Sequence, residues 1–370
     1  MDWFPKRRAF FTLLTAFLLL SLVAFFTNLY PAQIGDIGAS KEIVPDAHTA
    51  ATGNQDAAAP PSSSTPSTAP ATTEETDDET PEAEDLVEVN TKPTDAKDWK
   101  PKTFPAISAQ VKKVIQSNVL KTKKDDILLT AVANQGMAEY TLNWIESLKR
   151  TKLDTKFLVF SIDAELEQTM IDHGYGDHVV QIPQEWFHKQ LSSEFSKWLD
   201  SSYTPITHSK TLVVERLLYE GITVWFSDVD IVFTSDHIYD YLVEKLNSRR
   251  STTELLITQE TEQKITNSGF YLMRPTNTNK RILADTIMIQ DNEPKVTQQR
   301  AMNRVLDEMN LSYQTSSVAL LDLSLFPHGR MFFERNIPLK YGYEPLMVHA
   351  NYRVGEEKKK SLQAAGLWYI

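Results

Sequence analysis

Short apolar runs alternate with amphipathic stretches along the chain from about residue 125 onward. The apolar runs are rich in Val, Ile, Leu and Phe, which is typical of buried strands. They cover residues 127–133, 157–161, 179–182, 222–226, 255–258 and 270–273. The amphipathic stretches carry apolar residues every three or four positions, which predicts helices over residues 139–149, 210–220 and 296–309. Strands that alternate with helices predict an α/β fold with a mostly parallel sheet, flanked by helices and joined by right-handed crossovers.

A different pattern occupies the N-terminal region. Lys6, Arg7 and Arg8 precede an uncharged apolar stretch over residues 9–26, which is 18 residues long. Such a stretch is just long enough to cross a bilayer core of about 30 Å. It exceeds the apolar region of about 7–15 residues that a cleaved signal peptide normally has. We therefore predict a single transmembrane signal anchor over residues 9–29, with a cytosolic tail over residues 1–8 and a lumenal body.

Residues 30–100 predict a disordered stem. They are rich in Ala, Ser, Thr, Pro and acids, a composition that cannot bury enough apolar surface to fold. Residues 40–98 hold 14 acids and 3 bases, which equals the net charge of −11 of the whole chain. The body is therefore almost neutral, and nothing in its charge predicts a nucleic-acid partner.

The body, residues 101–370, is long enough for one large α/β domain. The chain has no cysteine, so it forms no disulfide and any metal must be held by oxygen atoms and imidazoles. Asn310 begins an Asn-Leu-Ser glycosylation sequon, which agrees with a lumenal location and predicts a glycoprotein.

Two acids one residue apart, Asp228 and Asp230, follow the apolar run 222–226. Ligands of open α/β sheets bind beyond the carboxyl ends of the strands. In an extended stretch residues i and i+2 point the same way, so both carboxylates are predicted to face one cation. Mn²⁺ and Mg²⁺ favour carboxylate oxygens together with substrate phosphates. The pattern predicts the metal site of a nucleotide-sugar glycosyltransferase; the alternative is an ordinary acidic turn after a strand.

Three further motifs have a functional and a structural interpretation. Asn267 and Gly269 belong to an Asn-Ser-Gly sequence that either contacts a sugar hydroxyl or forms a turn before a strand. His349 follows an apolar run and is either a third metal ligand or a structural histidine at a strand end. Gly355 and Lys358 offer a backbone amide and an ammonium group to a pyrophosphate, or belong to a solvated basic tail.

The order of these motifs resembles the nucleotide-diphospho-sugar transferases of glycosyltransferase family 77. The similarity lies in residues 209–233, 267–271, 321–329 and 348–358, with Asn134 and Asn143-Trp144 near the first strand. It implies a GT-A (Rossmann-like) fold, a Golgi membrane protein of type II topology, a metal-dependent nucleotide-sugar donor and retention of the anomeric configuration. Members of the family use galactose, xylose or arabinose donors, so the resemblance does not name the sugar.

The resemblance also assigns roles to residues of this chain. Asp228 and Asp230 would engage the metal and the nucleotide, and His349 would be the third ligand of Mn²⁺ or Mg²⁺. The remaining contacts to the nucleotide sugar, which is expected to be a UDP-sugar, would come from Asn134, Lys210, Asn267, Gly269, Gln299, Gly355 and Lys358. The acceptor would be a glycan or a glycoprotein.

One position departs from the family. Its members usually carry an Asp-Gln pair where this chain has Gln298-Gln299. An amide can bind a sugar hydroxyl, but it lacks the charge that stabilises a cationic transition state. This departure slightly favours one alternative, a Golgi protein that binds nucleotide sugars without turnover. A second alternative is a related yeast-type galactosyl- or mannosyltransferase, which would share Asp228 and Asp230 but not the segment 325–329.

Overall fold

The computed structural model describes residues 99–187, 203–249, 252–261, 264–293, 295–311, 313 and 316–370. The predicted cytosolic tail, signal anchor and stem up to residue 98 lie outside these ranges. Within the described residues, no helix combines the length and the apolarity needed to cross a bilayer.

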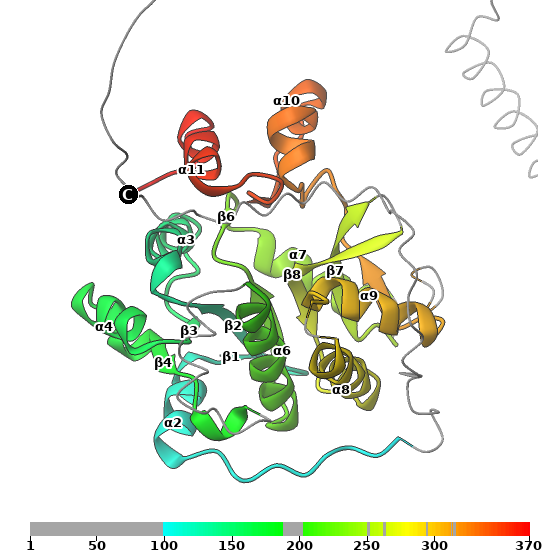
Figure 1. Cartoon of the computed structure of the whole chain (residues 1–370). Helices are drawn as coiled ribbons and strands as arrows, with labels where there is room; N and C mark the ends of the chain where they lie inside the picture. The colour runs from blue at the N-terminus through cyan, green and yellow to red at the C-terminus, as the bar shows by residue number, and fades with distance from the viewer. Residues whose placement is uncertain are drawn as a thin grey trace, which may run out of the picture. The chain divides into compact units, whose positions relative to one another are not determined.

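A mixed sheet forms the centre of the body (Figure 1). Its strands follow the order β4-β3-β2-β5-β8-β7-β9, and β1 pairs with the start of β2. β8 is antiparallel to both of its neighbours, and the other strands of the main path run parallel. The bounds are β1 Leu120–Lys121, β2 Asp126–Ala133, β3 Leu158–Ser161, β4 Val179–Gln181, β5 Thr223–Ser227, β7 Leu255–Thr261, β8 Ile265–Met273 and β9 Val318–Leu320. The prediction of a mostly parallel α/β sheet is confirmed.

Helices cover both faces of this sheet because side chains alternate between the faces along each strand. On β2, Leu128 and Val132 pack with α2, α6, α8 and α9, whereas Leu129 and Ala131 pack with α3, α4 and α7. These helices span α2 Ala109–Asn118, α3 Ala138–Arg150, α4 Ala164–Asp172, α6 Tyr203–Tyr219, α7 Ile238–Ser248, α8 Asn277–Asn292 and α9 Gln298–Glu308. The result is a three-layer body with an apolar core on each side of the sheet.

A second, two-stranded sheet is built from distant parts of the chain. β6 (Ile231–Phe233) pairs antiparallel with β10 (Met347–His349), so that His349 lies opposite Ile231. β10 follows the short helix α10 (Ile337–Tyr341) and precedes α11 (Gly355–Ala364). This small sheet carries the C-terminal segment to the carboxyl end of β5.

The hydrophobic pattern located strands better than helices. All six predicted strands exist, but β8 begins at Ile265, five residues before the predicted strand. The Asn267-Ser268-Gly269 sequence therefore lies inside a strand, and its interpretation as a turn before a strand is wrong. Lys358 belongs to α11 and its ammonium pairs with the buried Asp230, so for this lysine the interpretation as a solvated basic tail is wrong.

Candidate active site

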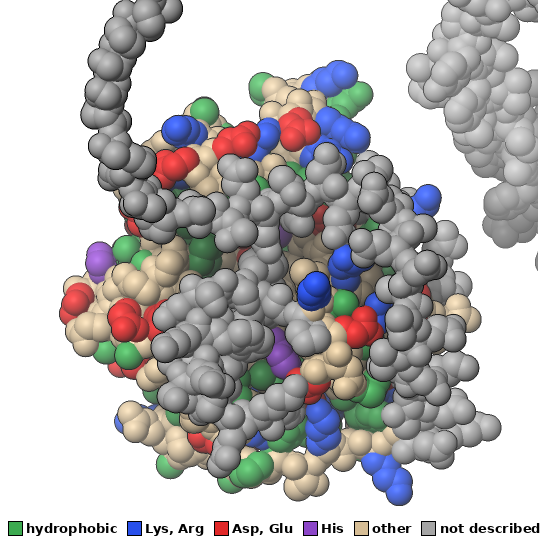
Figure 2. All heavy atoms as spheres, in the orientation of Figure 1, with side chains coloured by type: hydrophobic (Ala, Val, Ile, Leu, Met, Phe, Trp, Pro, Cys, Tyr) green, Lys and Arg blue, Asp and Glu red, His purple; other side chains and the backbone are tan. Residues whose placement is uncertain are grey.

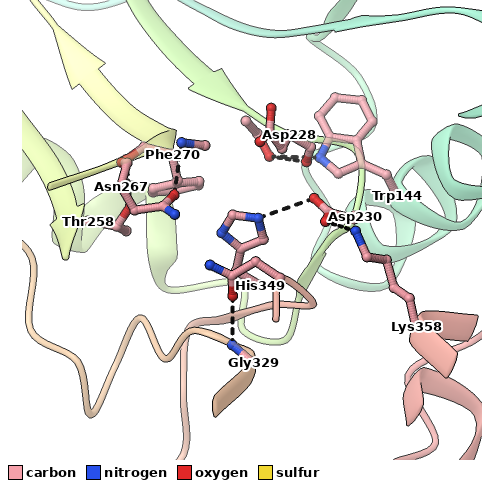
Figure 3. Close-up of polar contacts among 12 residues, drawn as sticks. Trp144, Asp228, Asp230, Thr258, Asn267, Phe270, Gly329, His349 and Lys358 are labelled. Carbon is pink, nitrogen blue, oxygen red and sulfur yellow. Dashed lines mark hydrogen bonds and ion pairs between the residues drawn. The ribbon is translucent and has the colours of Figure 1, made fainter. Parts of the chain in front are cut away.

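Asp228, Asp230 and His349 lie together at the carboxyl end of β5 (Figure 3). One ligand atom from each of the three side chains lies within 4.8 Å of the others. Asp228 directly follows β5, and its amide donates to the Gly269 carbonyl over 2.7 Å. Asp230 lies in the turn that leads to β6. The two carboxylates therefore converge through a turn, and the prediction that strand alternation aligns them is wrong.

Two lysines neutralise these carboxylates. The Lys210 ammonium lies 2.6 Å from Asp228 Oδ1, and the Lys358 ammonium lies 2.8 Å from Asp230 Oδ2. His349 Nε2 lies 3.3 Å from Asp230 Oδ1. Lys210 comes from α6 and Lys358 from α11, so two helices and two strand ends supply charge to one small volume.

Burial and charge act in opposite directions on the two most buried groups. Burial alone would raise the pKa of Asp230, but Lys358 and His349 outweigh it and hold that pKa well below its usual range. Burial alone would lower the pKa of His349, but the Asp230 carboxylate outweighs it and raises that pKa above the ordinary value of 6.5. Asp230 therefore stays ionised over the whole physiological range of pH.

Gly269 lies where no side chain fits. A Cβ atom there would be 2.6 Å from His349 Cε1, 2.7 Å from Asp228 Oδ2 and 2.9 Å from Asn267 Oδ1. The register between β7 and β8 jumps from Ile257↔Tyr271 to Thr258↔Asn267, so residues 268–270 bulge out of the ladder. The bulge brings the glycine backbone against two of the three predicted metal ligands, Asp228 and His349.

Asn267 and Gln299 use their amide groups to hold this bulge. Asn267 Oδ1 accepts from the Gly269 amide over 2.9 Å, and its Nδ2 donates to Glu260. Gln299 Oε1 accepts from the Ser268 amide over 3.2 Å. The neighbouring Gln298 is buried and also lines the cavity, with its side chain beside the buried Tyr271.

A cavity of about 230 Å³ opens over these groups. Of the predicted site residues, Lys210, Asp228, Asp230, Asn267, Gly269, Gln299, His349, Gly355 and Lys358 line it. Asn134 does not; it lies at the carboxyl end of β2, at the start of a short 3₁₀ turn. Gly355, with a φ of 51°, begins α11, so the N-terminal end of that helix borders the cavity.

The residue types fit a hard divalent cation. Two carboxylates and an imidazole are the oxygen and nitrogen donors that Mn²⁺ accepts, and a bound diphosphate would complete the coordination. The glycine backbone at residue 269 leaves the ligand atoms accessible from the cavity.

Six lining residues had no role assigned from the sequence: Glu260, Thr297, Asn351, Tyr352, Arg353 and Val354. Asn351 lies two residues after His349, so its proximity could have been inferred from the same motif. Tyr352 has a φ of 58°, which is unusual for a residue with a side chain, and its ring lies 4.8 Å from the Arg330 guanidinium. Glu260 stands in a polar stretch that gave no signal.

Comparison with known proteins identifies the group to which this site belongs. Residues 152–363 match the nucleotide-diphospho-sugar transferase family. The chain belongs to this family of nucleotide-sugar glycosyltransferases. The match contains every lining residue of the cavity, from Lys210 to Lys358, but not Asn134.

Individual relatives are distant. The chain is 23% identical over 285 residues to a UDP-galactose:fucoside alpha-3-galactosyltransferase of Dictyostelium discoideum. That alignment covers 67% of the present chain and 44% of the Dictyostelium relative, so the chain spans less than half of the relative's length.

Among solved structures, the glycosyltransferase GlyE of Streptococcus pneumoniae has a TM-score of 0.42 and 14% identity, with 64% of this chain and 59% of that chain covered. Mouse xyloside xylosyltransferase 1 has a TM-score of 0.38 and 11% identity, with 61% and 97% covered.

Proposed function

We propose that this chain is a metal-dependent, retaining glycosyltransferase that moves a sugar of the galactose, xylose or arabinose class from a nucleotide diphosphate. The proposed donor is a UDP-sugar and the proposed acceptor a glycan or glycoprotein. The observation that carries the proposal is the convergence of Asp228, Asp230 and His349 with two lysines in one cavity.

Each of these residues has a defined task in such a reaction. Asp228, Asp230 and His349 would hold Mn²⁺ or Mg²⁺, and a bound ion supplies Lewis-acid stabilisation of the departing diphosphate. Lys210 and Lys358, which now pair with the carboxylates, are placed to add positive charge to the same oxygens. The N-terminal end of α11 favours negative charge at the Gly355 side of the cavity.

Retention of configuration requires no nucleophile from the protein. In a front-face displacement the acceptor oxygen bonds to the anomeric carbon on the face that the diphosphate leaves. The acceptor proton passes to a diphosphate oxygen as the bond between that carbon and the diphosphate breaks. The family resemblance supports this stereochemistry for the chain.

We further propose a Golgi membrane location with type II topology and the body in the lumen. The apolar stretch 9–26, its basic N-terminal flank and the sequon at Asn310 support this location. Figure 2 shows side chains of both charge signs over α10 and α11.

A donor screen tests the proposed activity. The purified body would be incubated with UDP-galactose, UDP-xylose, UDP-arabinose or GDP-mannose, with Mn²⁺ or with EDTA, and with fucosides and xylosides as acceptors. We expect Mn²⁺-dependent transfer from one UDP-sugar, with retention visible by proton NMR of the product. Preference for GDP-mannose would favour the mannosyltransferase alternative. Tight nucleotide-sugar binding without turnover would favour the non-catalytic one, to which the neutral Gln298-Gln299 pair lends some support.

A further inference from the structure

Glu260 is a third carboxylate in the cavity, and the reaction derived above gives it no task. Asp228 and Asp230 are each paired with a lysine and lie beside His349. Both hydrogen bonds that the Glu260 carboxylate accepts from the described residues come instead from neutral side-chain amides. Its chemistry therefore differs from that of the two predicted metal ligands.

The backbone directs Glu260 into the cavity. β7 pairs with β8 as Gln259↔Thr266 and then Thr261↔Ile265, so Glu260 is the extra residue of a β-bulge. Bulges re-aim side chains and are frequent beside active sites. Gln259, the residue before the bulge, donates its amide to the Leu321 carbonyl over 2.7 Å and does not line this cavity.

Two side chains fix the direction of the carboxylate. Asn267 Nδ2 donates to Glu260 Oε2, and Asn351 Nδ2 lies 3.5 Å from the same oxygen. Asn267 approaches the Gly269 position that touches Asp228 and His349, and Asn351 follows His349 by two residues. Glu260 therefore lies outside the cluster of proposed metal ligands, and Asn267 contacts both Glu260 and the Gly269 backbone that borders the cluster.

Glu260 lines the same cavity as the proposed metal ligands, so it can meet the sugar of a bound donor. A diphosphate bound at Asp228 and Asp230 extends its sugar farther along the cavity, and a carboxylate is a strong acceptor for sugar hydroxyls. We propose that Glu260 contacts the transferred sugar, where it accepts hydroxyl hydrogen bonds and stabilises the positive charge that develops at the anomeric carbon. In this role Glu260 forms no covalent bond, and the acceptor proton and the leaving group follow the path described above.

This inference rests on the proposed function and predicts a specific pattern of loss. Glu260→Gln removes the charge and keeps the shape, and Glu260→Ala removes the group. Each variant would be compared with the wild type and with Glu244→Gln, at an exposed carboxylate of α7 that does not line the cavity. Affinities for UDP, UDP-galactose, UDP-xylose and UDP-arabinose would be measured by calorimetry with Mn²⁺, together with kcat and KM.

We expect UDP affinity to stay within about twofold of the wild type in both Glu260 variants, because the nucleotide and metal contacts remain. The extra affinity that the sugar adds to UDP should disappear, and kcat should fall about a hundredfold or more. Formate should partly restore Glu260→Ala, because a small anion can occupy the space of the missing carboxylate. Glu244→Gln should behave as the wild type.

Wild-type sugar affinity and a kcat within about threefold in Glu260→Gln would overturn the proposal while leaving the transferase function intact. Loss of UDP affinity in both Glu260 variants would also overturn it, since Glu260 would then support the nucleotide site. If the wild type and Glu244→Gln bind no nucleotide sugar at all, the proposed function fails first and the role of Glu260 fails with it.

Discussion

Asp230 combines the chemistry and the stability of the site in one carboxylate. Its side chain is buried and pairs with His349 and Lys358. Its backbone carbonyl accepts a hydrogen bond from the Ala350 amide over 3.1 Å. Replacing this side chain should therefore lower both the activity and the free energy of unfolding.

Asp230→Asn should lower turnover by about a hundredfold or more, because stabilisation of a leaving group in such a site is often worth about 3–4 kcal/mol. The metal-free protein should also lose about 1–3 kcal/mol of stability, since Lys358 and His349 lose their charged partner. Activity assays and thermal melts with and without Mn²⁺ and UDP measure both effects. Asp236→Asn is the control, because this nearby carboxylate is 39% exposed and pairs with Lys152. Near-normal turnover in Asp230→Asn would show that Asp228 and Asp230 form an ordinary acidic turn without a catalytic role.

His349 predicts opposite pH dependences for the metal-free and metal-bound protein. Asp230 raises its pKa, so the stability that the protonated imidazole contributes is fully present below about 6.5 and is lost as pH rises through the raised value. Metal binding needs the neutral ring, so the stabilisation by Mn²⁺ should grow over that same window.

Melting curves from pH 5.5 to 9 would show both trends, and His349→Ala should flatten them and raise the Mn²⁺ concentration needed for activity. Unchanged metal dependence in His349→Ala would show that the histidine is structural.

Gly269 predicts a steric effect confined to the site. In Gly269→Ala the new methyl group would overlap His349 Cε1 at 2.6 Å and Asp228 Oδ2 at 2.7 Å. We expect Mn²⁺ affinity to fall tenfold or more and stability to fall by about 1–3 kcal/mol, as for overpacking elsewhere. Gly176→Ala is the matched control, because its nearest neighbour would be Ile171 Cγ1 at an ordinary 3.6 Å. Equal Mn²⁺ affinity in the two variants would contradict the close approach.

At the scale of elements, the site depends on strand ends that other contacts hold in place. Trp144 of α3 donates its indole N–H to Ser227 Oγ over 3.0 Å, and Ser227 Oγ donates to the Asp228 carbonyl over the same distance. At the opposite end of the strands, Arg274 after β8 donates two hydrogen bonds of 2.9 Å to Asp125 before β2. This second contact should serve stability alone.

Asp125→Asn tests that separation. The Asp125 side chain is 8% exposed, and Thr223 of β5 also donates to it over 3.0 Å. Breaking such a buried pair should cost about 3–5 kcal/mol and leave kcat unchanged in the folded fraction. Asp126→Asn, whose exposed carboxylate pairs with exposed Lys121, should cost no more than about 1 kcal/mol.

The pH dependence supports the same assignment. Burial alone would raise the pKa of Asp125, but Arg274 outweighs it and lowers that pKa below 3.8. The stability from this pair is therefore present above about pH 4 and is lost as pH falls through the lowered value. The free energies of unfolding of the wild type and of Asp125→Asn, measured against pH, should converge below that range. Curves that stay parallel would assign the loss to another cause.

At the scale of the whole molecule, the body should fold without the N-terminal region. Residues 99–370 include every described element and the Lys102–Glu215 pair, whose carboxylate is 1% exposed. We expect this fragment to be soluble, to melt cooperatively and to keep the donor affinity of the full chain. A fragment that starts at residue 120 lacks α2 and its core residues Val111 and Ile115, so it should melt at a lower temperature. Failure of the longer fragment to fold would place the domain boundary before residue 99.

The sequence by itself determined the strands, the metal-ligand candidates and the order of the motifs. Short apolar runs such as 127–133 and 222–226 are unambiguous because a strand buried on both faces must be apolar throughout. Asp228 and Asp230 could be singled out because they follow such a run directly. Helices were less visible: α8 has Asn and Thr in its first turn and buries Asn279, Asp285 and Gln290, so its apolar periodicity is weak.

Only the tertiary structure decided what these candidates touch. The pairing of β6 with β10 joins His349 to acids about 120 residues earlier in the chain, and a sequence pattern does not encode such a register. The two bulges between β7 and β8 place Gly269 against the ligands and turn Glu260 into the cavity. A bulge shifts every later side chain by one face, and this shift depends on how two strands pair and not on either strand alone.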